Sequence, residues 1–177
     1  MKPHIFLVPV LATAGVAGEG QAADIELSIE IPRLQVGEYH RPYVASWIEN
    51  GTQAHVADLL VWYDVEMRND QGTTWLKDLR QWWRKSGRSV KLPIDGISGP
   101  TRPVGKHDAK VPLSKIKLPP LEQGEYSLVI EAAREVGGRE LLRIPFKWDG
   151  KTAVAASTEG KTELGKIEFK INTAAAE

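Results

Sequence analysis

The chain has 177 residues, of which 42% are hydrophobic and 26% are charged, and it contains no cysteine. This length predicts one globular domain with a sizeable core, and the lack of cysteine excludes disulfides, thiolate metal sites and cysteine nucleophiles. The 23 basic and 23 acidic side chains cancel to a formal net charge of +0, which argues against general nucleic-acid binding.

The first 22 residues differ from the rest of the chain. Lys2 and His4 precede the apolar run IFLVPVLATAGVAG, which ends in the small-residue pattern Gly20-Gln21-Ala22. The run is too short to cross a hydrocarbon layer about 30 Å thick, so we interpret residues 1–22 as a signal peptide rather than a membrane anchor. No other segment approaches transmembrane length. We therefore expect a mature periplasmic chain that does not span the membrane.

Alternating apolar residues predict the first strand over residues 25–31. Two further apolar runs, 43–49 and 56–67, flank Asn50-Gly51 and predict an antiparallel hairpin, because both turn residues tolerate positive φ. The second run is apolar on both faces, which is typical of a central strand covered by another layer.

A different period marks residues 73–85, where apolar residues recur at three- and four-residue spacings and predict a short helix. Asp70 and Thr73 are suited to cap its beginning, and Gly87 is suited to a left-handed end.

Further alternation predicts a second hairpin from residues 126–132 and 142–148, then a connector over 150–160 and a last strand over 166–171. Six or more short strands with one helix predict an all-β, immunoglobulin-like antiparallel β-sandwich over residues 23–172. We expect the helical insert to cross one end of the sandwich and the tail, 173–177, to be disordered.

Positive charge is concentrated between residues 77 and 91, where six basic side chains meet one acidic side chain, Asp78. Next to Trp82 and Trp83, such a patch could hold a phosphate, a flavin ring or an acidic partner. Alternatively, the cations form the solvated face of an amphipathic helix whose buried stripe is Trp75, Leu79 and Trp82. Because neighbouring residues point in different directions on a helix, we expect one of the adjacent tryptophans near the surface.

Enzymatic chemistry has little support. His40, His55 and His107 share no metal-ligand spacing, and the chain has no Gly-x-Ser-x-Gly motif. The acidic residues of the strands alternate with apolar ones, as on a solvated sheet face. We predict that the chain is not an enzyme, and we assign none of its residues to a metal site.

The stretch DGISGPTRP, residues 95–103, predicts a compact exposed turn, because its glycines and prolines restrict or free the backbone locally. We expect the hydroxyl of Thr101 to point outward from this turn.

Three blocks of the sequence, LKDLRQWWRK, DGISGPTRPVG and GEYSLVIEAAREVGGRELLRIPFKW, together resemble a bacterial family of predicted periplasmic proteins of unknown function. The resemblance implies an immunoglobulin-like periplasmic domain. It also implies a setting near PepSY-type membrane proteins and flavin transferases, linked to iron uptake or extracytosolic electron transfer.

The loop is also similar to the attachment motif of covalent FMN carriers, Asp-x-Ser/Thr-Gly-Ala-Thr. The resemblance places the acid at Asp95, offset by one residue, with Ser98, Gly99 and the acceptor hydroxyl of Thr101 following it. Two residues depart from the motif, because Pro100 replaces alanine and Pro103 replaces a trailing hydroxyl residue. The resemblance implies FMN linked to Thr101 by a phosphoester, with its charge balanced by Arg88, Arg102 or Lys106.

Three functions follow as hypotheses. The first is a non-enzymatic accessory domain that docks onto a partner of a membrane redox or iron-uptake system, such as a PepSY-type membrane protein or a flavin transferase. The second is an electron carrier with FMN on Thr101, and the third is a carbohydrate-binding module that uses exposed tryptophans. The docking hypothesis assigns partner binding to Arg80, Trp82, Trp83, Arg84, Arg88 and Arg102.

Overall fold

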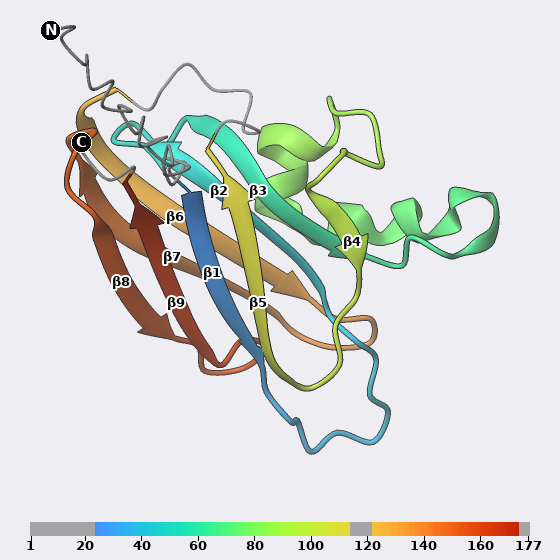
Figure 1. The fold of residues 1–177 in the computed structure, drawn as a ribbon. Helices are drawn as coiled ribbons and strands as arrows, with labels where there is room; N and C mark the ends of the chain where they lie inside the picture. The colour runs from blue at the N-terminus through green and yellow to red at the C-terminus, as the bar shows by residue number, and fades with distance from the viewer. Residues whose placement is uncertain (1–23, 114–121, 174–177) are drawn as a thin grey trace, which may run out of the picture.

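Two β-sheets packed face to face form the framework of the computed structural model, which describes residues 24–113 and 122–173 (Figure 1). One sheet has four strands in the order β5-β1-β9-β8, and every neighbouring pair in it is antiparallel. Its strands are β1 (Asp24–Ile31), β5 (Gly105–Pro112), β8 (Val154–Glu159) and β9 (Lys166–Asn172).

The second sheet has five strands in the order β4-β3-β2-β6-β7, and only its β3–β4 pair is parallel. Strand β3 is buried along most of its length, which confirms the predicted central strand. The strands are β2 (Tyr43–Asn50), β3 (His55–Tyr63), β4 (Ser98–Pro100), β6 (Gly124–Ala133) and β7 (Arg139–Trp148).

The main core lies between the two sheets and confirms the β-sandwich. The apolar residues of the first alternating run, Ile25, Leu27, Ile29 and Ile31, are all buried in it. The last strand contributes the matching set, Ile167, Phe169 and Ile171. The finer likeness to the immunoglobulin fold stays a prediction. The predicted signal peptide, residues 1–22, and residues 174–177 of the predicted disordered tail lie outside the described residues.

Both predicted hairpins are present, but the first turn differs from the predicted one. Its left-handed residue is Gln53, with φ of 61°, and neither Asn50 nor Gly51 adopts positive φ. Asn50 instead accepts hydrogen bonds at Oδ1 from the amides of Thr52 and Ala54. Strands β4, β5 and β8 were not predicted; β8 lies in the expected connector, and β4 lies in the expected turn.

The helical insert comprises residues 68–87 and follows β3 directly. It consists of a 3₁₀ segment η1 (Arg68–Asp78), one α-helical turn α1 (Arg80–Trp82) and a π-helical segment η2 (Trp83–Gly87). The prediction that it crosses one end of the sandwich is wrong. Leu76, Leu79 and Trp82 pack against the outer face of the five-stranded sheet in a second apolar cluster.

Three buried carboxylates of the five-stranded sheet bind the insert. Glu131 of β6 accepts hydrogen bonds from the backbone amides of Gln81 and Trp82, at 3.0 and 2.8 Å to its Oε2. Arg139 on β7 donates to the other oxygen of Glu131 at 2.5 Å. Since a buried carboxylate without partners is unfavourable, these bonds fix where the insert begins its α-helical turn.

Asp58 of β3 makes the central attachment. Its Oδ1 accepts a 2.8 Å hydrogen bond from the indole Nε1 of Trp82 and lies 2.9 Å from Nε2 of His55. Its Oδ2 accepts a 2.6 Å hydrogen bond from the hydroxyl of Ser86. This one carboxylate therefore joins both α1 and η2 to the sheet.

Glu49 of β2 makes the third attachment. Its carboxylate accepts hydrogen bonds from Trp47 Nε1 at 3.0 Å and Arg143 Nε at 3.4 Å, and it pairs with Lys85 Nζ at 3.0 Å. Burial raises the pKa of Glu49, but the bonds from Lys85 and Trp47 and the charge of Arg143 outweigh it, so its pKa lies below the ordinary value.

Gly87 permits close contact rather than a left-handed helix end. A Cβ built on Gly87 would lie 2.6 Å from Cζ3 of Trp82 and 2.9 Å from Cε3 of Trp83. We expect Gly87→Ala to lower the free energy of unfolding by about 1–3 kcal/mol, because buried indoles have little room to move. Urea unfolding measures this, with Gly37→Ala as the control, since nothing lies within 4 Å of that position. Equal losses in both variants would contradict the contact.

The lowered pKa of Glu49 predicts a pH-dependent attachment of the insert. The unfolded chain binds the proton at about 4.5, above the folded pKa, so the stabilisation is complete above that pH and is lost as pH falls through the folded pKa. Glu49→Gln is expected to lower the free energy of unfolding by about 1–3 kcal/mol at neutral pH.

The difference in the free energy of unfolding between wild type and Glu49→Gln should then become smaller when urea unfolding is measured at pH values from about 7 down to about 3. The exposed Glu125→Gln is the control, because Glu125 and its partner Lys147 both lie largely in solvent. A gap that stays constant over this range would show that the charge of Glu49 does not stabilise the insert.

Candidate functional site

Thr101 follows the short edge strand β4 and is held by its backbone. Its amide donates a 3.2 Å hydrogen bond to the carbonyl of Tyr63, which extends the pairing of β4 with β3 by one residue. The Thr101 hydroxyl makes no hydrogen bond within residues 24–113 and 122–173. The backbone of Thr101 is therefore fixed, whereas its hydroxyl is available.

The other residues of the predicted attachment motif shape the loop. The hydroxyl of Ser98 accepts a 2.9 Å hydrogen bond from the amide of Ile94, and Gly99 lies against the Trp62 ring. Asp95 is exposed in the turn, beside Gly96 with φ of 70°. Ser98 therefore stabilises the turn, and of these residues only Thr101 faces the hollow described next.

A hollow of about 490 Å³ lies beside Thr101. It is bounded by β2, by the chain leaving β3, by the 3₁₀ segment η1 and by the β6–β7 turn. The aromatic rings in its wall are those of Tyr43 and Trp75. The full lining consists of His40, Arg41, Tyr43, Asp64, Met67, Trp75, Asp78, Thr101, Ala133, Arg134 and Glu135.

Its aromatic walls were not predicted from the sequence. Trp75 was assigned to the buried stripe of the insert, but it is 36% exposed, and Leu76 takes the buried position. The Tyr43 hydroxyl donates a 3.1 Å hydrogen bond to the carbonyl of Gly72, which joins this wall to the insert. The only sequence signal for the exposure of Trp75 is the helical period of the apolar residues in the insert, and the 3₁₀ segment η1 does not follow that period.

The charges around the hollow leave one cation unpaired. Arg134 donates to both oxygens of Glu163, at 2.9 and 3.1 Å, and His40 lies 3.6 Å from Glu135. Arg41, in contrast, is exposed, and its side chain makes no ion pair or hydrogen bond in the described part of the chain. It is therefore the cation that is available to an anion placed there.

The two tryptophans of the predicted docking patch have different positions. Trp82 is 0% exposed and bonded to Asp58, so it cannot contact a partner directly. Trp83 is half-buried, with its ring centroid 6.4 Å from that of Trp82. The expectation that one of the pair lies nearer the surface is met by Trp83, and the patch that remains is mainly cationic.

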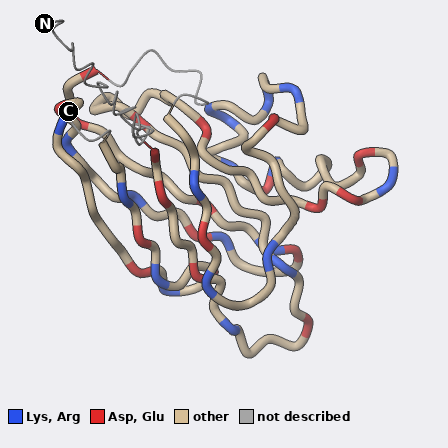
Figure 2. Tube along the Cα trace, in the orientation of Figure 1, with Lys and Arg blue, Asp and Glu red and all other residues tan. Residues whose placement is uncertain are grey.

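Arginines define that patch, which we call the cationic edge, consisting of Arg80, Arg84 and Arg88. All three are exposed, Arg80 and Arg84 on the insert and Arg88 at the C-cap of η2, and only Arg84 has a hydrogen-bonded side-chain partner among the described residues, Gln81 Oε1 at 2.5 Å. Lys85 instead points inward and donates to the carbonyl of Gln53. Figure 2 shows that Lys and Arg also occur along the strands of both sheets, where they are interspersed with Asp and Glu.

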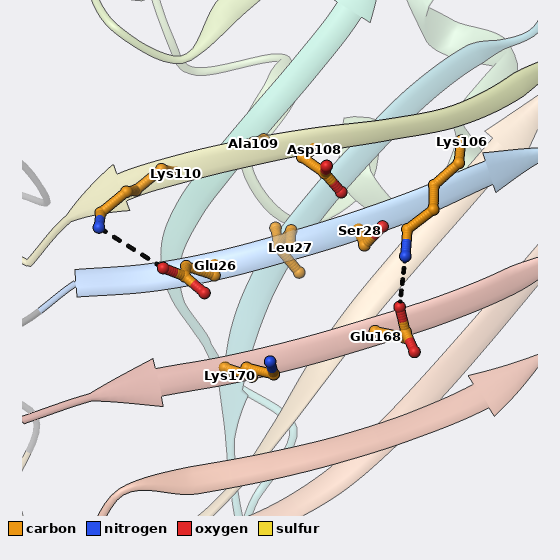
Figure 3. Close-up of a pocket in the computed structure, with 9 residues that line it drawn as sticks. All are labelled: Glu26, Leu27, Ser28, Lys106, Asp108, Ala109, Lys110, Glu168 and Lys170. Carbon is orange, nitrogen blue, oxygen red and sulfur yellow. Dashed lines mark hydrogen bonds and ion pairs between the residues drawn. The ribbon is translucent and has the colours of Figure 1, made fainter.

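Arg102 and Lys106, proposed to balance a phosphate on Thr101, lie elsewhere. The Cζ of Arg102 is 5.3 Å from the centroid of the Trp62 ring, and its buried Nε has no hydrogen-bond partner among residues 24–113 and 122–173. Lys106 pairs with Glu168 at 2.8 Å on the four-stranded sheet (Figure 3). Neither residue lines the hollow at Thr101.

A second hollow, of about 410 Å³, lies on the outer face of the four-stranded sheet (Figure 3). Two of its basic side chains pair with acidic ones, Lys110 with Glu26 at 3.5 Å and Lys106 with Glu168 at 2.8 Å. Ser28 and Ala109 make it shallow because they are small. We interpret it as a solvated sheet face.

The described residues contain neither a metal-binding cluster nor a membrane-spanning helix. The part of the chain that the structure describes holds no group of three or more His, Asp or Glu side chains placed to bind a metal. Within the same residues, no helix is long and apolar enough to cross a membrane.

Comparison with known proteins identifies the family. Residues 24–166 match the family described as predicted periplasmic proteins (DUF2271), which covers the sandwich from β1 to the beginning of β9 and includes the insert. No curated protein and no solved structure matches the chain. The family resemblance of the three sequence blocks is thus confirmed, and the chain belongs to the DUF2271 family of predicted periplasmic proteins.

Proposed function

We propose that this protein is a non-enzymatic periplasmic electron carrier with FMN attached covalently to Thr101. The observation that carries the proposal is the position of the Thr101 hydroxyl, which has no hydrogen-bond partner among the described residues and lines a hollow with two aromatic rings. The similarity of residues 95–101 to an FMN attachment motif also supports Thr101 as the attachment residue.

The residues of the hollow fit the chemistry of a flavin. Its volume of about 490 Å³ is within the usual range of cofactor pockets, about 300–1,000 Å³. Tyr43 and Trp75 line the hollow with aromatic rings suited to contact another ring system, and Arg41 supplies a positive charge that has no ion-pair partner among the described residues. A phosphodiester carries one negative charge, so a single cation suffices to balance it.

Pro100, which departs from the motif, does not disrupt the strand. The carbonyl of Ile97 and the amide of Thr101 both bond to β3, so the alternate residues of β4 direct their backbone groups away from the sheet. Because β4 is an edge strand, the missing amide of Pro100 removes no hydrogen bond between strands. Proline also restricts the backbone immediately before Thr101.

Attachment requires a flavin transferase and a dinucleotide donor, FAD. The Thr101 oxygen attacks the phosphorus on the FMN side of the FAD pyrophosphate and forms a new P–O bond. The bond to the AMP side breaks, AMP leaves, and the hydroxyl proton passes to a base. When bound, FMN supplies one- and two-electron transfer, while the protein positions it and sets its electrostatic surroundings.

Intact mass tests the attachment. We expect the protein from its native periplasm, or co-produced with a flavin transferase, to be heavier by FMN minus water. Thr101→Ala should lose this increment, because the acceptor oxygen is gone, and Thr101→Ser should keep it. Thr73→Ala, which removes a hydroxyl on the insert, away from the attachment loop, is the control. An unmodified wild-type mass in both preparations would reject the carrier.

A second candidate function is docking through the cationic edge. Arg80 and Arg88 are exposed and make no ion pair in the described residues, while Asp58, Glu49 and Glu131 hold the insert firmly. A rigid, unpaired cationic surface is suited to an acidic partner. We propose a PepSY-type membrane protein of a redox or iron-uptake system, and this role is compatible with a bound flavin.

Charge reversal tests the docking. Arg80→Glu, Arg84→Glu and Arg88→Glu together should abolish capture of the PepSY-type protein by the immobilised chain at low salt, because like charges then face the partner. The matched control reverses Lys151, Lys161 and Lys170, which are exposed on the sandwich and change the net charge equally. Capture that survives the first set, or is lost equally with both sets, would contradict docking at this edge.

A further inference from the structure

We infer that Trp75 is the ring against which the flavin on Thr101 rests, and that Arg41 is the cation beside its phosphodiester. The inference rests on the proposed attachment of FMN and deepens it, because it assigns the surroundings of the flavin to residues outside the attachment loop. These residues come from the chain before β2 and from the insert.

Packing accounts for the other tryptophans. Trp47, Trp62, Trp82 and Trp148 are at most 7% exposed. Trp83 is half-buried against the cluster beneath the insert.

Trp75 differs because it is 36% exposed and lines the hollow that Thr101 also lines. An indole on a shared wall with the attachment residue is placed to cover a tethered aromatic group.

Tyr43 supplies the other aromatic ring that lines the hollow, and two contacts fix its position. Its hydroxyl bonds to Gly72, and its ring meets that of Tyr63 edge-on, with centroids 6.3 Å apart. Because Gly72 belongs to the same 3₁₀ segment as Trp75, this bond holds the two walls of the hollow together. The hollow is thus a built feature rather than a gap between independent loops.

Charge favours a tethered flavin over a free one. Three acidic side chains, Asp64, Asp78 and Glu135, line the hollow with Arg41 and Arg134. Arg134 is neutralised by Glu163, so Arg41 is the cation left for the ligand. The phosphate of free FMN carries about 1.5 to 2 negative charges at neutral pH, as other phosphomonoesters do, and the acids would repel it more than they repel the diester.

Flavin fluorescence tests the contact with Trp75. An indole in contact with an isoalloxazine quenches its emission by donating an electron to the excited flavin, whereas a phenyl ring is a much poorer donor. We therefore expect Trp75→Phe to raise the emission per bound FMN several-fold and to lengthen its lifetime. Trp83→Phe, the matched change outside the hollow, should leave both unchanged. Thermal unfolding of each variant verifies that the fold is kept.

The reduction potential tests Arg41. Arg41→Gln removes a positive charge next to the flavin, which makes reduction less favourable, so the midpoint potential of the attached FMN should become more negative. Arg80→Gln, on the cationic edge, should shift it much less.

Intact mass, measured first, separates the two proposals. A wild-type mass without FMN would overturn both. Stoichiometric FMN with emission unchanged by Trp75→Phe, or a potential unchanged by Arg41→Gln, would overturn that residue's assignment and leave the carrier standing.

Discussion

The burial of three carboxylates beneath the helical insert is the constraint on which the site depends. Glu49, Asp58 and Glu131 lie on the outer face of a sheet, where water would normally solvate them, yet the insert covers them. Each is stable there only because the insert and the neighbouring strand supply donors to it. The same bonds hold the insert against the sheet, so the sheet positions η1 and the exposed face of Trp75 indirectly.

Sequence patterns predicted the strands whose alternation is strong and missed those whose alternation is weak. The runs that became β1 and β9 place isoleucines and a phenylalanine on one face, which makes the period visible. Strands β5 and β8 read GKHDAKVP and VAASTE, and they occupy the two edges of the four-stranded sheet. Their pairing depends on β1 and β9, so no local pattern could have shown it.

The candidate site was predictable only in part. A local motif indicated Thr101, whereas Arg41, Tyr43 and Trp75 come from segments that only the tertiary structure brings together. The insert is not a regular helix, so the apolar period of its sequence wrongly indicates that Trp75 is buried. Alternation predicts a solvated face for the acidic residues of the strands, but Glu131 is buried and bonded to backbone amides of the insert.

An electron carrier needs a fixed attachment point and a cofactor that a partner can still approach, and this fold separates the two requirements. The backbone of Thr101 is bound to the five-stranded sheet, while one wall of the hollow belongs to the insert. The cationic edge lies on that same insert, which the buried carboxylates hold in place. A partner that binds the edge would therefore be positioned relative to the hollow by the sheet itself. The docking proposal and the carrier proposal are therefore compatible, because in both the insert would be the element involved, lining the flavin site in one and contacting the partner in the other.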